Sequence, residues 1–335
     1  MLEKIIEFSI RQRWLVMAIV LGLAGLGIWN FNRLPIDAVP DITNVQVQVN
    51  TEAPGFSPLE AEQRITFPVE TAISGLPGLS YTRSVSRYGL SQVTVVFEDG
   101  TDIYRARQLV SERIQSAQAD LPPGITPEPG PIATGLGEIY MYILSAEPGA
   151  LKEDGTPWSP MDLRTLNDWV VLPQLRTVKG VTEVNTIGGF KKEIHVLPDP
   201  AAMAGFGLTL DDIIQAIDRN NANAGAGYIE RHGEQNLIRV PGQAETLDDL
   251  RDITVKDTGV VSVRLRDVAE VREGEELRTG AATQNGAEIV LGTAFMLVGE
   301  NSRTVSIAVD EKVDTIRPSL PEGVTITPVY NRTTL

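Results

Sequence analysis

The sequence predicts an α+β protein: one N-terminal transmembrane helix, then a repeated βαββαβ unit that carries an inserted small α+β subdomain. Three observations lead to this fold class. The chain of 335 residues begins with a long uncharged apolar run. Strand and helix patterns then alternate along the chain. Finally, Leu121–Thr126 (LPPGIT) recurs in similar form at Leu320–Thr325 (LPEGVT), each time after a predicted helix, which indicates a duplicated unit.

The apolar run from Trp14 to Trp29 contains no charge and, with its apolar neighbours, reaches about 20 residues, enough to cross a bilayer as a helix. Lys4, Arg11 and Arg13 precede it, and the next basic residue is Arg33. The positive-inside rule therefore places the N-terminus in the cytoplasm and the bulk outside. A cleaved signal peptide is the alternative, but it has a shorter apolar region and a small-residue cleavage site. The sequence favours an uncleaved anchor.

The first repeat opens with a strand, because Val45, Val47 and Val49 alternate with polar residues. Ser57–Glu60 forms a capping box that starts a helix, and Pro68 predicts a kink in it. The patterns that follow predict strands at 80–87 and 92–98, a helix at 101–119 and a further strand. This order is the ferredoxin-like, or split βαβ, arrangement.

The second repeat is interrupted by an insertion. Its first part is predicted as a strand at 138–146, a helix at 159–178 and strands at 181–187 and 192–197, and its closing part as a strand at 288–298 and a helix at 302–319. The insertion, about 200–278, is predicted as a helix at 209–219, a flexible loop at 220–227, a hairpin at 228–231 and 236–240, and strands within 260–271. It reads as a third small α+β subdomain.

Composition narrows the chemistry. The net charge is −15, from 44 acidic and 29 basic residues, which argues against a nucleic-acid partner. The absence of cysteine excludes disulfides, cysteine zinc sites, iron–sulfur clusters and thiol nucleophiles. His195 and His232 are the two histidines, and both are expected to be ordinary surface residues. Any metal handled by this chain must therefore be met mainly by carboxylates.

Seven motifs together resemble one family, the resistance–nodulation–division transporters, in their heavy-metal-efflux branch of the cobalt–zinc–cadmium type. The resemblance runs from Met1 to Leu335. The motifs are Leu34–Asp41 (LPIDAVPD), Pro54–Gly55 (PG), Thr66–Glu70 (TFPVE), Phe97–Asp102 (FEDGTD), Gly130–Gly137 (GPIATGLG), Leu166–Trp169 (LNDW) and Ile187–Gly189 (IGG).

The resemblance implies a domain plan. Two ferredoxin-like porter subdomains would face the periplasm, and the insertion would be half of a docking subdomain. A whole member is about three times longer and carries membrane carboxylates that relay protons. The chain is therefore expected to be an N-terminal fragment or a truncated product. The implied boundaries are 1–32 for the N-terminus and first membrane helix, 33–134 for the first porter subdomain, 135–199 and 279–335 for the two parts of the second, and 200–278 for the docking subdomain.

The resemblance also implies a function. The family exports metal ions from the inner membrane against protons, works as a homotrimer in membrane lipid, and joins a periplasmic adaptor and an outer-membrane channel. The expected substrate is a divalent ion, zinc first, with cobalt, nickel and cadmium as the others. Neither enzymatic activity nor a resident cofactor is expected.

Two carboxylates are the candidate metal ligands. Glu138 starts the strand that opens the second repeat, where copper and silver members of the family carry an aromatic residue, so a carboxylate there suits a divalent ion. Asp168 lies in the following helix beside Trp169, and in zinc-type members an acid at this position joins the site. Without the resemblance, Glu138 reads as a solvated strand-end residue and Asp168 as part of a solvated helix face.

Three alternatives stay open. A copper or silver exporter of the same branch would need methionine ligands from outside this chain. A self-standing membrane-anchored periplasmic metal-binding module would bind metal without the rest of a pump. A hydrolase is the remote third, because the chain contains no nucleophile-elbow or other catalytic signature.

Overall fold

A computed structural model describes residues 10–33, 44–132, 137–222, 224–231, 234–240, 242–257, 259, 262–278 and 280–334. The chain divides into two compact units, and each is described by itself. The first unit comprises Met1–Pro157, Leu166–Ile187 and Val290–Leu335, and the second comprises Trp158–Thr165 and Gly188–Ile289.

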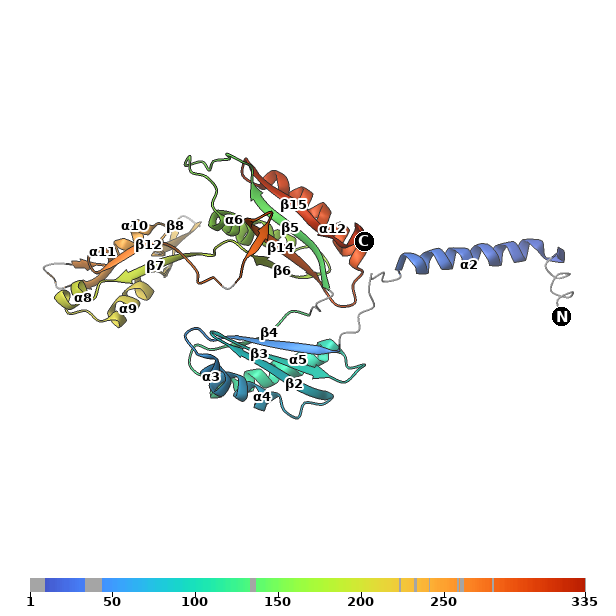
Figure 1. Ribbon diagram of the computed structural model, residues 1–335, viewed down its shortest axis with the longest axis horizontal. Coiled ribbons are helices and arrows are strands. Elements are labelled where there is room, and N and C mark those ends of the chain that lie inside the picture. Colours follow the sequence, from blue (N-terminus) through green and yellow to red (C-terminus); the bar gives the residue numbers. More distant parts are fainter. Residues whose placement is uncertain are drawn as a thin grey trace. The chain divides into compact units, whose positions relative to one another are not determined.

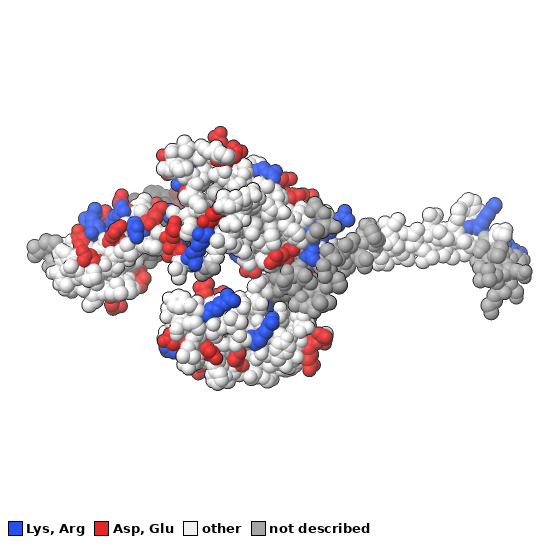
Figure 2. Space-filling model, viewed as in Figure 1, with Lys and Arg blue, Asp and Glu red and all other residues white. Residues whose placement is uncertain are grey.

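Helix α2 (Arg13–Arg33) is the long N-terminal helix that the sequence predicts. Its apolar side chains are exposed, and the stretch Arg13–Asn30 is long and apolar enough to cross a bilayer. Figure 2 shows the helix almost free of charge along its length, with basic side chains at its N-terminal end. A water-exposed helix of this composition would be costly, so its apolar surface needs lipid or protein around it.

The first sheet has four antiparallel strands in the order β2–β3–β1–β4 (Figure 1). Helices cover one face, and the core between them contains Val49, Val95 and Val110, all fully buried. The expected strands and helices are confirmed to within a few residues. The elements are β1 (Gln46–Glu52), α3 (Pro58–Ala61), the π-helical turn η1 (Glu62–Thr66), α4 (Phe67–Ile73), β2 (Leu79–Arg87), β3 (Leu90–Phe97), α5 (Ile103–Ala117), the 3-10 turn η2 (Gln118–Asp120) and β4 (Pro127–Pro129).

The start of this helical layer follows the predicted capping chemistry. The Ser57 amide and hydroxyl both donate to the Glu60 carboxylate, at 3.0 Å and 2.7 Å, and the Glu60 amide donates back to the Ser57 hydroxyl. Near Pro68, where the sequence predicts a kink, the structure has the π-helical turn η1, which ends two residues before the proline. A proline lacks the amide that a regular helix would use there, so the hydrogen-bond ladder is rearranged just before it.

The second sheet repeats this order of elements. Its strands lie in the order β6–β14–β5–β15, the same as β2–β3–β1–β4 when each is numbered along its own repeat, and β13 adds to part of β14. Its helical layer again contains a π-helical turn that ends two residues before a proline, Pro173. The elements are β5 (Glu138–Ala146), α6 (Pro160–Leu166), η4 (Asn167–Val171), α7 (Leu172–Leu175), β6 (Val181–Ile187), β13 (Ala282–Gln284), β14 (Ala287–Met296), α12 (Ser302–Ile316), η5 (Arg317–Ser319), β15 (Val324–Asn331) and η6 (Arg332–Thr334).

The second unit is a small α+β body built on three two-stranded pairs, β7–β12, β10–β11 and β8–β9. Three expectations are corrected here. The strand expected at 192–197 in the second repeat is β7, which pairs with β12 of this unit and not with the second sheet. Strand β8 begins at Ala224 and pairs with β9, so the second half of the expected loop is strand. Leu265–Val268, expected within a strand region, is a helical turn, and its first and last residues are both buried in the core. The elements are β7 (Lys192–Pro198), α8 (Pro200–Phe206), α9 (Leu210–Asn220), β8 (Ala224–Arg231), β9 (Glu234–Val240), α10 (Leu247–Arg251), β10 (Thr254–Asp257), β11 (Ser262–Arg264), α11 (Leu265–Val268) and β12 (Ala269–Glu275).

Candidate functional site

Glu138 is the first residue of β5 and is half-buried. It lies opposite Phe295 of β14, and Phe295 in turn lies opposite Glu183 of β6. One row across three strands therefore contains two carboxylates, with Cα atoms separated by two strand spacings, or about 10 Å. The sequence gives no sign of this relationship, because it depends on β14, which lies more than a hundred residues away from both acids.

Asp168 is the second residue of the π-helical turn η4 and is also half-buried. Its Oδ1 accepts a hydrogen bond of 2.7 Å from the hydroxyl of Thr186 on β6. The carboxylate is therefore held against β6 while part of its surface stays exposed. The neighbouring Trp169, by contrast, is 80% exposed.

The hydrogen bond to Asp168 is the last in a chain of three side-chain hydrogen bonds. The Tyr142 hydroxyl of β5 donates to Asn167 Oδ1 at 2.9 Å, and Asn167 Nδ2 donates to the Thr186 hydroxyl at 2.8 Å. Burial raises the pKa of the Tyr142 phenol well above its ordinary value, so this hydroxyl stays protonated and serves as a donor.

The two acids belong to the same sheet-and-helix layer. Glu138 lies opposite Phe295 of β14. Asp168 is hydrogen-bonded to Thr186, which lies opposite Gly292, three residues from Phe295 along β14. Within the part of the chain that the structure describes, no three acidic or histidine side chains come close enough to hold a metal ion together. A complete metal site would need ligands from elsewhere.

His195 is a surface residue of β7, as expected. Its Nε2 lies 3.3 Å from Glu193 Oε2, and a third of its side chain is exposed. Its ring lies against Gly274 of the paired strand β12, in space that any side chain at that position would fill. His232 lies outside the described residues.

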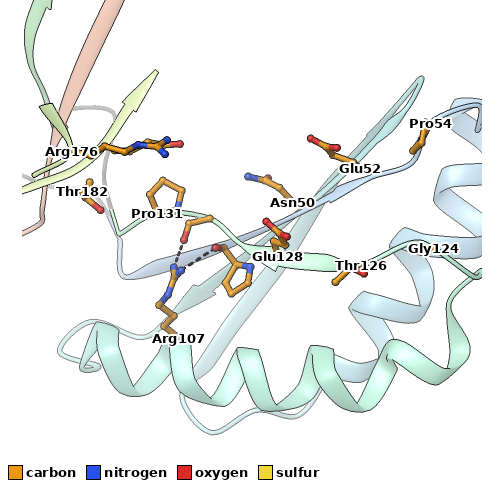
Figure 3. A pocket seen from close by; sticks show the side chains of 13 residues that line it. Asn50, Glu52, Pro54, Arg107, Gly124, Thr126, Glu128, Pro131, Arg176 and Thr182 are labelled. Carbon is orange, nitrogen blue, oxygen red and sulfur yellow. Dashed lines mark hydrogen bonds between the residues drawn. The ribbon is translucent and has the colours of Figure 1, made fainter. Parts of the chain in front are cut away.

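The first unit also contains an open cleft of about 750 Å³. Figure 3 shows Arg107 reaching from α5 to the end of β4, where it donates to the carbonyls of Pro129, at 3.0 Å, and Gly130. Charges of both signs line this cleft, so it suits small polar or ionic species better than apolar ligands. The lining residues are Asn50, Glu52, Pro54, Arg107, Gly124, Thr126, Glu128, Pro129, Gly130, Pro131, Arg176, Thr182 and Glu183.

The described residues contain one helix long and apolar enough to cross a membrane, followed by two sheets with the same strand order. The sequence profile of the AcrB/AcrD/AcrF family matches residues 5–335, so the chain belongs to this family. The resemblance to its heavy-metal-efflux branch is confirmed by individual relatives.

The chain is 62% identical, over all 335 residues, to the cation efflux system protein CzcA of Alcaligenes sp. strain CT14 and to the cobalt-zinc-cadmium resistance protein CzcA of Cupriavidus metallidurans. It spans 32% of the length of each. A crystal structure of a heavy metal efflux pump superimposes with a TM-score of 0.86 at 33% identity, over 98% of this chain and 32% of that one. The mixed helix-and-sheet fold is therefore that of a heavy metal efflux pump over about a third of its length.

Proposed function

We propose that this chain forms the N-terminal part of an inner-membrane antiporter that exports divalent metal ions in exchange for protons. The observation that carries the proposal is the 62% identity, over the full chain, to a protein named for cobalt, zinc and cadmium resistance. The chain acts in transport and not in chemical catalysis.

The proposed architecture follows the order of the elements. Residues 33–134 form one ferredoxin-like porter subdomain, 135–199 with 279–335 form a second, and 200–278 form half of a docking subdomain. Helix α2 is the first membrane helix, with its N-terminus in the cytoplasm and the bulk of the chain in the periplasm. The assembly is a homotrimer that joins a periplasmic adaptor and an outer-membrane channel.

Glu138 and Asp168 are the proposed metal ligands of this chain, with zinc as the first substrate among zinc, cobalt, nickel and cadmium. Both are half-buried carboxylates on one sheet-and-helix layer. Oxygen ligands suit these divalent ions better than copper(I) or silver(I), which prefer sulfur. Because a transported ion must also leave, a site with few ligands from any one segment is adequate.

A chimera tests the proposal. Residues 1–335 replace the matching third of the Cupriavidus metallidurans protein, and the chimera is expressed with its partner proteins in zinc-sensitive cells. The chimera is expected to restore zinc tolerance. Glu138→Ala and Asp168→Asn are each expected to lower it by about tenfold or more in zinc concentration, because a ligand is lost.

The matched control is Glu270→Ala, an exposed acid on β12 whose oxygen lies 3.7 Å from Arg272. It is expected to leave tolerance as in the parent chimera. A chimera that reaches the membrane and gives no tolerance would contradict the transport proposal. Unchanged tolerance in Glu138→Ala and Asp168→Asn would contradict the two ligands. Tight zinc binding by residues 1–335 alone would favour a self-standing binding module.

A further inference from the structure

We infer that Tyr142, Asn167 and Thr186 are positioning residues that orient the Asp168 carboxylate toward the transported cation. The inference rests on the proposed function of Asp168 as a metal ligand. It adds three residues that do not themselves bind metal.

The first support is the direction of the hydrogen bonds. Tyr142 donates to the amide oxygen of Asn167, so the amide nitrogen faces Thr186. The Thr186 hydroxyl accepts that bond, and its single proton goes to Asp168 Oδ1. The hydrogen bonds therefore run in one direction, from Tyr142 through Asn167 and Thr186 to one carboxylate oxygen of Asp168. Hydrogen bonds of this kind fix the orientation of metal-binding side chains in other proteins.

The second support is the backbone of β14. Gly292 lies between Tyr142 and Thr186 in the same row of the sheet. A side chain at Gly292 would overlap the ring of Tyr142. The absence of that side chain lets the phenol cross the middle strand and reach Asn167, which comes from the helical layer.

The third support is a comparison between the two repeats. Each has a π-helical turn that ends two residues before a proline, and aligning Pro68 with Pro173 places Glu62 and Gln63 where the second repeat has Asn167 and Asp168. Glu62 and Gln63 are exposed. Asn167 is fully buried and Asp168 is half-buried. The turn itself therefore does not require polar residues to face the sheet.

The turn of the first repeat makes a different set of hydrogen bonds. There the buried hydroxyl of Thr66 lies 2.6 Å from Ser91 Oγ and 2.8 Å from Ser86 Oγ. The partners of the Thr66 hydroxyl are these two hydroxyls and the carbonyl of Ala61, and none of them is a carboxylate. In the second repeat, by contrast, the chain of hydrogen bonds ends on the half-buried carboxylate of Asp168. Four polar side chains must be ordered to form it. An acid that needs a fixed orientation explains the difference.

The test uses the chimera described above, in everted membrane vesicles, with zinc as the probe. The concentration of zinc that gives half-maximal transport and the maximal rate are measured separately. Thr186→Val is expected to raise the half-maximal concentration by about tenfold, within the range of 10- to 100-fold for the loss of such supporting bonds. Thr186→Ser keeps the hydroxyl and is expected to restore the low value. Tyr142→Phe removes the far end of the chain and is expected to have a smaller effect in the same direction.

The matched control is Thr325→Val on β15, which removes a hydroxyl 3.2 Å from that of Ser145 in the same sheet, outside the chain of bonds. Membrane level and melting temperature are recorded for each variant. If Asp168→Asn raises the half-maximal concentration and Thr186→Val does not, the positioning role is wrong while the ligand stands. A fall in melting temperature with an unchanged half-maximal concentration also overturns it. If Asp168→Asn itself has no effect, the ligand assignment fails.

Discussion

The phenol ring of Tyr142 occupies the space that a side chain at Gly292 would need. The two residues lie opposite each other on β5 and β14, in the centre of the second sheet. The hydroxyl of the same tyrosine donates a hydrogen bond to Asn167 Oδ1, so Gly292, Tyr142 and the helical layer are coupled. The stability of this sheet is therefore expected to be sensitive to substitution of Gly292.

Gly292→Ala is expected to lower the free energy of unfolding by about 1–3 kcal/mol, because the added methyl group displaces a fully buried tyrosine ring. Chemical denaturation of the full chain in detergent measures it. Gly205→Ala is the control, because Gly205 lies in α8 with nothing within 4 Å of the added atom. It is expected to be neutral or slightly stabilising. Equal effects of the two substitutions would contradict the overlap at Tyr142.

Tyr140→Phe is expected to destabilise the same sheet by about 1.5–3 kcal/mol. The Tyr140 hydroxyl donates a 2.6 Å hydrogen bond to Asp310 Oδ1 on α12, and its removal leaves a half-buried carboxylate without that donor. Tyr104→Phe on α5 is the control, since that side chain is more than half exposed and should change stability by less than about 0.5 kcal/mol. A loss in Tyr140→Phe no larger than in the control would contradict the role of this bond.

Stability is expected to fall as the pH rises above about 10. Burial raises the pKa of Tyr140 well above its ordinary value of 10.0, and the bond to Asp310 adds to the shift. The unfolded chain therefore releases this proton before the folded chain does, so the stabilisation is complete below pH 10 and is lost as the pH rises toward the folded value. Melting curves across this range should fall more steeply for the parent than for Tyr140→Phe. Parallel curves would count against a shifted tyrosine.

His195→Gln is expected to leave the zinc dependence of transport unchanged in the vesicle assay. The imidazole contacts Glu193 and the backbone of Gly274, and neither contact belongs to the layer of Glu138 and Asp168. Glu138→Gln, measured beside it, is expected to raise the half-maximal zinc concentration by about tenfold. A comparable rise for His195→Gln would mean that imidazole contributes to metal handling.

The sequence predicted most helices and strands, because each depends mainly on the residues within it and at its ends. The strands at 138–146 and 181–187 coincide with β5 and β6, since each is a short run bounded by loop residues. The capping box at Ser57 also lies where the sequence places it. The two π-helical turns were not predicted, because one rearranged turn leaves the apolar spacing of a helix almost unchanged.

The sequence predicted the two candidate ligands one by one, but not the residues that surround them. Glu138 and Asp168 stand out by resemblance, but their partners come from strand pairing. Glu183 joins the row of Glu138 through Phe295, and Thr186 reaches Asp168 from a strand that follows it in the chain. Such neighbours depend on register between distant strands, which the sequence alone does not reveal.

The two prolines of β4 limit the backbone hydrogen bonds that this edge of the first sheet can offer to another strand. The amide of Gly130 donates to Gln48 of β1, so by the alternation of an antiparallel ladder the backbone groups of Pro127 and Pro129 face outward. Neither proline has an amide hydrogen, and the carbonyl of Pro129 is already taken by Arg107. The two prolines therefore offer no backbone N–H to another strand along this edge.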